Sequence, residues 1–317
     1  MKQQECIDAY LKHMRVRNFS PETVAGHDLR LKKWAAFCRQ QKIEDVEEVT
    51  PKTIRQFQAW LFEYTDPATG HKLQPQTQNN NAEAVARLFR FAWEEGFVPE
   101  NPAKRIEYAK EPKRLPRTVL TTTEMRRLLN CPETDRLVGY RDRTILEVLY
   151  GTMIRRGELQ RLKVEDVNFE DKVLRVNAGK GNKDRVVPLG KMAARYLKHY
   201  LKDIRPHFIQ GKDLGFLFLS TRGRELSRSM TWFIVRKYAE SLGLGKKVYP
   251  HCFRATGLTQ MMRNGANIRH LMEIAGHASL ESLNSYLAVE VNELKETLAR
   301  THPRELDLEG DRQGQRV

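Results

Sequence analysis

The segment from residue 251 to residue 286, HCFRATGLTQMMRNGANIRHLMEIAGHASLESLNSY, holds several side chains that can do chemistry. His251 and Arg254 are three residues apart, so on a helix both side chains lie on one face. His277 follows a glycine, and Tyr286 comes nine residues later. An imidazole can move a proton, a guanidinium is a permanent cation and a phenol can act as a nucleophile. The segment therefore gathers groups that could work together on one substrate.

Two earlier segments add to this set. RRGEL places Arg155 and Glu158 at the same three-residue spacing, and we expect Glu158 to hold the Arg155 guanidinium in a bidentate pair. VNFEDKVLRVNAGKGNKDRVVPLG alternates apolar and polar residues around a glycine-bearing turn, which predicts a small antiparallel sheet. Lys180 and Lys183 lie on that turn, from which a long cationic side chain can reach outward.

These residue types fit the cleavage of a phosphodiester. Two guanidinium forks match the non-bridging oxygens of one phosphate and stabilise the charge that grows on them. A tyrosine hydroxyl can attack phosphorus and form a covalent phosphotyrosine, and a lysine can protonate the leaving hydroxyl. The sequence shows neither the acidic clusters that would hold a metal nor a GxxxxGK(S/T) phosphate loop. We therefore expect no metal and no cofactor. Because a covalent phosphotyrosine preserves the bond energy, we also expect no use of ATP, which agrees with the absence of the phosphate loop.

Each of these residues has an ordinary alternative explanation when it is taken alone. A lone arginine in a basic protein is most often a surface charge, and Lys180 could simply occupy a turn. His277 could cap a helix or pack in the core, and Tyr286 is one of ten tyrosines. The combined order Arg, Lys, His-x-x-Arg, His, Tyr, with its short local spacings, is what favours a shared site.

This order resembles the tyrosine recombinases, also called the phage-integrase family, and is most similar to their compact Xer-like members. RDRTILEVLYGTMIRRGEL looks like the segment of the first catalytic arginine, and GKGNKDRVVPL is similar to the hairpin of the catalytic lysine. HCFRATGLTQMM matches the His-x-x-Arg motif, and IAGHASLESLNSY matches the segment of the nucleophile. The resemblance runs from about residue 5 to about residue 305. It implies six catalytic residues: Arg155, Lys180, His251, Arg254, His277 and Tyr286.

The resemblance also implies a role for each residue. The two arginines clamp the scissile phosphate, and Lys180 protonates the departing 5′ oxygen. His251 assists proton removal from Tyr286, which forms the 3′-phosphotyrosyl link, and His277 hydrogen-bonds the phosphate. Glu158 does not contact the substrate but contacts residues that do.

Two positions depart from the family pattern. The family often has Thr-Gly-x-Arg before its first arginine, whereas this chain has Met153 in place of the glycine, which places the local turn in question. Many Xer-like members have a second histidine directly after His-x-x-Arg, and Ala255 stands there in this chain. The second departure favours integrases of mobile elements over chromosome-dimer resolution.

Composition favours a nucleic-acid partner. The net charge is +15, and it is uneven: residues 1–110 hold 17 Lys and Arg against 15 Asp and Glu, and the rest of the chain holds 38 against 25. A basic surface attracts polyanions, although solvated lysines on an ordinary enzyme would look the same. The four cysteines form no CxxC pair, and neither a membrane span nor a secretion signal is visible. We expect a cytoplasmic, nucleoid-associated protein of a bacterium or archaeon.

The chain reads as mainly α-helical with a small antiparallel β-sheet. Four or five helices are expected in the first hundred residues, beginning near residue 3, with Ser20 and Thr50 as N-caps and no strand before residue 110. By resemblance, residues 1–108 form a helical core-binding domain of the SAM-like type and residues 118–304 an α+β catalytic domain. A proline-rich basic linker, 109–117, lies between them, and a polar tail follows from residue 305.

Double-stranded DNA is the expected partner. The cations expected to contact its backbone are Lys104, Arg105, Lys110, Lys113, Arg114, Arg117, Lys183 and Arg185. The family acts as a tetramer on two DNA sites, and accessory DNA-binding proteins are possible. Two alternatives stay open: a type IB topoisomerase that nicks and reseals one strand, and a non-catalytic DNA-binding or excision-accessory protein that kept the fold.

Overall fold

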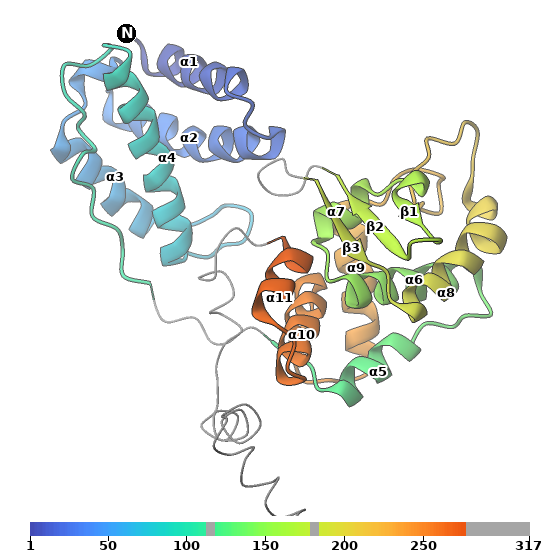
Figure 1. The fold of residues 1–317 in the computed structure, drawn as a ribbon. Coiled ribbons are helices and arrows are strands. Elements are labelled where there is room, and N and C mark those ends of the chain that lie inside the picture. The colour runs from blue at the N-terminus through green and yellow to red at the C-terminus, as the bar shows by residue number, and fades with distance from the viewer. Residues whose placement is uncertain (112–117, 178–183, 277–317) are drawn as a thin grey trace, which may run out of the picture. The chain divides into compact units, whose positions relative to one another are not determined.

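The computed structural model describes residues 1–111, 118–177 and 184–276. The chain divides into two compact units, residues 1–114 and 115–317, and each is considered by itself (Figure 1). Among the described residues the only sheet is a three-stranded antiparallel one, and helices form most of the remainder. The predicted fold class is therefore confirmed. The boundary at residue 108 stays a prediction.

The first unit is a helical bundle in which three helices begin with proline, a residue that is favoured at the first position of a helix. Ser20 Oγ accepts the Thr23 N–H at 3.2 Å and Thr50 Oγ1 accepts the Thr53 N–H at 3.3 Å, which confirms both predicted N-caps. Within residues 1–111 there are isolated bridges but no strand, as expected. The helices are α1 (Gln3–Val16), α2 (Pro21–Gln41), η1 (Val46–Glu48), α3 (Pro51–Glu63) and α4 (Pro75–Glu94).

An aromatic cluster fills the core of this unit. Trp34 is fully buried and meets Phe57 and Phe89 edge-to-face, with ring centroids 5.0 and 5.6 Å apart. Its indole N–H donates to Gln3 Oε1 at 3.0 Å, so the polar group of a buried tryptophan is satisfied. These contacts bring α1, α2, α3 and α4 around one centre.

The second unit packs helices around a small sheet. Its sheet joins β1 (Val167–Asn168), β2 (Val173–Val176) and β3 (Arg185–Pro188) in that order, which confirms the predicted antiparallel sheet. Leu174, Val176 and Val187 face its core side, as the alternating pattern requires. The helices are α5 (Thr122–Asn130), α6 (Leu137–Thr152), α7 (Arg156–Arg161), η2 (Val164–Asp166), α8 (Lys191–His199), η3 (Tyr200–Ile204), η4 (Arg205–Phe208), α9 (Arg228–Ser241), α10 (Pro250–Arg263) and α11 (Ile268–Ala275).

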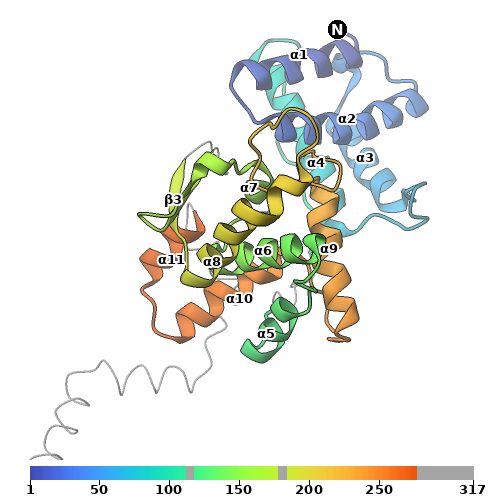
Figure 2. The ribbon, with the colours of Figure 1, turned by 90° about the vertical axis from the view of Figure 1, so that its right-hand side faces the viewer.

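Helix α6 is the central helix of this unit. It packs against α8 and α10, and most of its residues are buried (Figure 2). Two arginines on its buried surface are neutralised on the same helix, Arg141 by Asp142 and Arg143 by Glu147, each at 2.7 Å. Helix α6 ends shortly before Arg155 and α7, and it packs on α10, which carries His251 and Arg254. It therefore connects two segments of the predicted site.

Candidate active site

Arg155 is the N-cap residue of α7 and comes two residues after Met153, the C-cap of α6. Its backbone N–H donates to Glu158 Oε2 at 2.7 Å, and its Nη1 donates to Glu158 Oε1 at 2.9 Å. Its Nη2 donates to the carbonyl of Gly276 at 2.8 Å. Gly276 lies 121 positions later in the sequence. Because the side chain remains 27% exposed, the guanidinium can still receive a ligand.

Arg254 lies in the second turn of α10 and is 1% exposed. Its Nη1 donates to the carbonyl of Met153 at 2.8 Å and its Nη2 to the carbonyl of Ala275 at 2.5 Å. A buried guanidinium needs acceptors for its N–H groups, and backbone carbonyls from two different segments provide them. Arg254 therefore ties the end of α6 to the end of α11.

The two predicted clamp arginines meet at the C-terminal end of α11. Gly276 caps this helix in the left-handed region, with φ 58°, where a glycine is favoured. The last carbonyls of a helix carry partial negative charge, so they attract cations. Arg155 and Arg254 each use one of these carbonyls, although they are 99 residues apart in the sequence. The site lies directly before residue 277.

His251 lies in the first turn of α10 and is half-buried. Pro250 stands at N1 of this helix, where its missing N–H costs nothing, so the helix begins directly before the histidine. The predicted helical spacing of three residues between His251 and Arg254 is confirmed, and it puts both side chains on one face of α10.

Met153 adopts the left-handed conformation at the end of α6, with φ 53° and ψ 23°. This is the position where the family pattern has glycine, and the turn keeps a backbone conformation that suits glycine. Gly151 is still helical, and the helix ends at Thr152, directly before this turn. The Met153 side chain is 4% exposed and packs over Gly257 on α10, where an added Cβ would lie 2.8 Å from Met153 Cγ.

Glu158 is buried and is shared by two arginines. The bidentate partner expected for it was Arg155; the structure instead gives that geometry to Arg185, whose Nη1 and Nη2 each donate to one carboxylate oxygen at 2.9 Å. The expectation was wrong because Arg155, as an N-cap, uses its own backbone N–H for the second oxygen. Burial alone would raise the pKa of Glu158, but hydrogen bonds from Arg185 and Arg155 outweigh it and lower the pKa to about 2. Glu158 is therefore a carboxylate at neutral pH.

Several predicted residues fall outside the described parts of the chain. The structure brings together Arg155, Arg254, Glu158 and Arg185, with His251 on the helix of Arg254. The predicted residues outside residues 1–111, 118–177 and 184–276 are Lys113, Arg114, Arg117, Lys180, Lys183, His277 and Tyr286, and so are the turn at 178–183 and the polar tail.

Lys104, Arg105 and Lys110 are exposed on the first unit. The segment that carries Lys110 is attached to α4: Asn79 accepts the N–H of Ala109 at 2.8 Å and donates to its carbonyl at 2.9 Å. Residues 107–111 therefore belong to the helical unit, and Lys110 extends from a backbone that this unit holds in place.

No group of three or more His, Cys, Asp or Glu side chains in residues 1–111, 118–177 and 184–276 could hold a metal ion. Over the same ranges, no helix is long and apolar enough to span a membrane.

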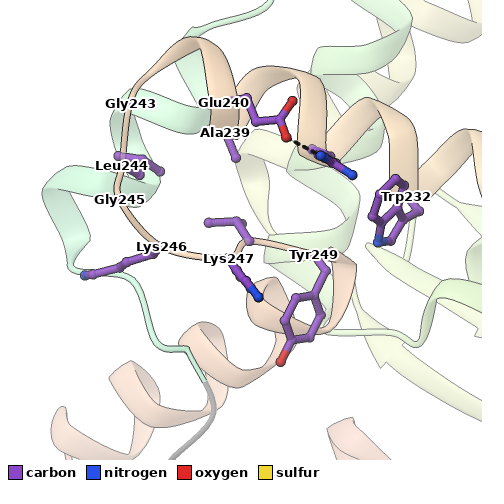
Figure 3. A pocket seen from close by; sticks show the side chains of 11 residues that line it. Trp232, Ala239, Glu240, Gly243, Leu244, Gly245, Lys246, Lys247 and Tyr249 are labelled. Carbon is purple, nitrogen blue, oxygen red and sulfur yellow. Dashed lines mark hydrogen bonds and ion pairs between the residues drawn. The ribbon is translucent and has the colours of Figure 1, made fainter. Parts of the chain in front are cut away.

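A surface pocket of about 750 Å³ lies between the end of α9 and the segment that leads to α10 (Figure 3). Trp232, Leu244 and Tyr249 line it together with Lys246 and Lys247. Arg236 and Glu240 also line the pocket and form an ion pair. The pocket contains none of the predicted catalytic residues, so it is separate from the arginine site.

Comparison with known proteins identifies the class that this fold and site define. The phage integrase family model matches residues 118–293, and the phage integrase SAM-like domain model matches residues 4–109. The chain belongs to the phage integrase family.

Named relatives agree with this assignment. Tyrosine recombinase XerD of Staphylococcus saprophyticus is 32% identical over 299 residues, covering 94% of this chain and 98% of the relative. The protein of the same name from Staphylococcus haemolyticus is 30% identical over 306 residues, with the same coverage.

Solved structures resemble the fold over nearly its whole length. The Tn1549 transposon integrase in complex with transposon right end DNA has a TM-score of 0.71 at 19% identity, covering 95% of this chain and 99% of that one. The XerH site-specific recombinase bound to difH substrate has a TM-score of 0.65 at 22% identity, covering 92% and 83%. At these identities the likeness establishes the fold.

Sequence reasoning missed three features of this site. It did not foresee that the guanidinium of Arg185, a predicted DNA contact, donates to both oxygens of Glu158. It did not foresee that Gly257 provides the space for Met153, or that the carbonyls ending α11 receive both arginines. Gly257 in the middle of a helix was a usable signal, because glycine disfavours helix interiors unless close packing requires it.

Proposed function

We propose that this protein is a site-specific DNA recombinase that cleaves and rejoins duplex DNA through a 3′-phosphotyrosyl intermediate. One observation carries the proposal: Arg155 and Arg254 converge on the last carbonyls of α11, directly before the segment that contains His277 and Tyr286. Membership of the phage integrase family supports the same chemistry.

The arginines act on the non-bridging oxygens of the scissile phosphate. As the Tyr286 oxygen attacks phosphorus, the P–O bond to the 5′ oxygen breaks and negative charge grows on the two remaining oxygens. Guanidinium groups already held in place stabilise this charge without reorganising. Arg155 is anchored by Glu158 and Arg254 by Met153, so both cations are preorganised.

Proton transfer completes the step. His251 takes part in removing the proton from the Tyr286 hydroxyl, and Lys180 gives a proton to the departing 5′ oxygen. His277 donates a hydrogen bond to the phosphate. Attack by a 5′-hydroxyl from the partner strand reverses the same steps, releases the tyrosine and rejoins the backbone, so no external energy source enters.

DNA binding involves both units. The SAM-like unit, residues 1–108, is the core-binding domain, residues 118–304 form the catalytic domain, and the basic segment 109–117 connects them. Most contacts go to phosphates, which position the protein without reading sequence. The contacting cations are Lys104, Arg105, Lys110, Lys113, Arg114, Arg117 and Lys183.

The assembly is a homotetramer on two DNA sites, and it exchanges one pair of strands and then the other. It acts in the cytoplasm, on the nucleoid. Ala255 stands where many Xer-like members have a second histidine, and this favours integration or excision of a mobile element.

The decisive experiment traps the covalent intermediate. Genomic DNA fragments incubated with the protein are denatured in detergent, and the protein-linked fragments are sequenced to obtain the cleavage site. A duplex of this site with a nick beside the cleavage point then accumulates the intermediate, which migrates as a shifted band on a denaturing gel. Tyr286→Phe should bind this DNA and give no band. A band from the Phe variant would show that another residue attacks.

The same substrates separate the alternatives. A topoisomerase would relax supercoiled DNA carrying the site but would not exchange strands between two duplexes. A non-catalytic accessory protein would bind the site and form no covalent adduct. Exchange between two labelled duplexes, abolished by Tyr286→Phe, is the outcome that we expect.

A further inference from the structure

Arg185 is the first residue of β3, and its guanidinium is directed into the protein. Its Nη1 and Nη2 donate to the two oxygens of Glu158 at 2.9 Å each, and its Nε donates to the carbonyl of Ile274 at 3.3 Å. The side chain is only 13% exposed, about half the exposure of the Arg155 side chain at 27%. All three nitrogens of its guanidinium therefore donate to acceptors within the protein, and two of them form a fork on one carboxylate.

The shared carboxylate connects Arg185 to Arg155. Glu158 Oε1 accepts Nη1 of both arginines, and Oε2 accepts the Arg155 backbone N–H and Arg185 Nη2. A buried carboxylate beside a phosphate clamp would by itself offset the charge of Arg155 and repel the phosphate. Arg185 adds the second positive charge, so the group of three residues keeps a net charge of +1 and Arg155 is held without being neutralised.

The backbone at Gly276 is a second observation that concerns the placement of the Arg185 side chain. A Cβ added there would lie 2.9 Å from Arg185 Nε and 3.0 Å from Cδ and Cζ, so the guanidinium fills the space that the glycine leaves open. Gly276 also ends α11 in the left-handed conformation. Arg185 therefore packs against the point where the chain leaves α11 towards the predicted nucleophile.

We infer that Arg185 is a positioning residue of the cleavage reaction, not a contact to DNA. It holds Glu158, and through Glu158 the guanidinium of Arg155, and it braces the end of α11 against β3. This inference rests on the proposed recombinase function. It replaces the expectation, drawn from the sequence, that Arg185 binds the DNA backbone.

The test separates binding from cleavage. On the nicked duplex, Arg185→Gln should lower the single-turnover cleavage rate at saturating protein by about 10–100-fold, by analogy with the loss of a residue that orients a metal ligand. Its Kd for the uncleaved site and the salt dependence of that Kd should stay within about twofold of the parent. Lys110→Gln is the contrasting variant, because losing one phosphate contact should reduce the logarithmic salt slope by about 1.

A double-mutant cycle shows whether Arg185 acts through Arg155. If it does, Arg185→Gln should cost less than about threefold in cleavage rate once Arg155→Ala is present, because its target is gone. Arg185→Lys keeps the charge but cannot form the two-pronged contact, so it should recover only part of the rate. Thermal unfolding of each variant identifies any that fail to fold, and Arg185→Lys then replaces Arg185→Gln in the cycle.

The outcomes are distinct. Weaker DNA binding with a lower salt slope and an unchanged saturating rate would make Arg185 a DNA contact and overturn the inference. A full 10–100-fold loss in the Arg155→Ala background would also overturn it, since Arg185 would then act independently of Arg155. Failure of the recombinase function itself would appear differently, as the absence of any covalent adduct from the parent protein.

Discussion

The close contact between Met153 and Gly257 determines how much stability the protein should lose when a side chain is added at residue 257. A Cβ at residue 257 would lie 2.8 Å from Met153 Cγ and 2.9 Å from Met153 Sδ, closer than such atoms approach in proteins. Met153 has little room to move, since it is 4% exposed and its carbonyl accepts Nη1 of Arg254 at 2.8 Å. Overpacking of this kind costs about 1–3 kcal/mol.

Gly257→Ala should therefore destabilise the protein in spite of helix propensity. Alanine gains about 1 kcal/mol over glycine inside a helix, so the net loss should be up to about 2 kcal/mol. For a unit of this size each kcal/mol lowers the melting temperature by about 2–4 °C. Thermal and urea unfolding of the variant should show this loss, and DNA cleavage should fall with it because the Met153 carbonyl orients Arg254.

A second substitution tests the cause. Met153→Gly suits the φ of 53° but removes a buried side chain. Losing the side chain costs about 2–5 kcal/mol and relief of the left-handed strain returns about 1, so alone it should destabilise by about 1–4 kcal/mol. Combined with Gly257→Ala it removes the clash, so the pair should be at least about 1 kcal/mol more stable than the sum of the single losses predicts. Strictly additive losses would refute the reasoning, because they would mean that the two residues do not compete for one space.

Three further predictions concern charge and proton transfer. Lys180→Ala should slow cleavage by about 10²–10⁴-fold. A substrate with a 5′-bridging sulfur, a leaving group that needs no proton, should restore the rate of this variant but not that of Arg155→Ala. If the sulfur substrate does not restore the rate, Lys180 is not the acid. If roughly eight phosphates are contacted, the logarithm of the affinity for DNA should fall with the logarithm of the salt concentration at a slope of about −7. Lys113→Ala with Arg114→Ala should weaken binding to all sequences alike, and a flat salt dependence would contradict the proposed contacts to the DNA backbone. Because the pKa of Glu158 is lowered to about 2, its stabilising effect is present above its ordinary pKa of 4.5 and is lost as the pH falls towards 2. Glu158→Gln should therefore reduce the free energy of unfolding by up to about 3 kcal/mol at pH 7 and by roughly half as much at pH 3. If the free-energy difference between parent and variant does not change with pH, the charge of the carboxylate is not what stabilises the site.

The sequence by itself determined the features that depend on local spacing. Ser20 and Thr50 cap their helices because an N-cap side chain reaches only three residues ahead. Alternating apolar residues predicted the small sheet because the side-chain period of a strand is two. The three-residue spacing of His251 and Arg254 placed both on one face of α10 for the same kind of reason. The order of the motifs was enough to indicate the family and its chemistry.

Only the tertiary structure decided how the site is held together. The contacts of Arg155 with Gly276 and of Arg254 with Met153 join residues 121 and 101 positions apart, and no local periodicity encodes such pairings. The fork from Arg185 to Glu158 spans 27 positions and depends on how β3 lies beside α7 and α11. An arginine at the surface and an arginine held on a buried carboxylate have the same letter in a sequence. Packing alone determines which carboxylate or phosphate each one meets.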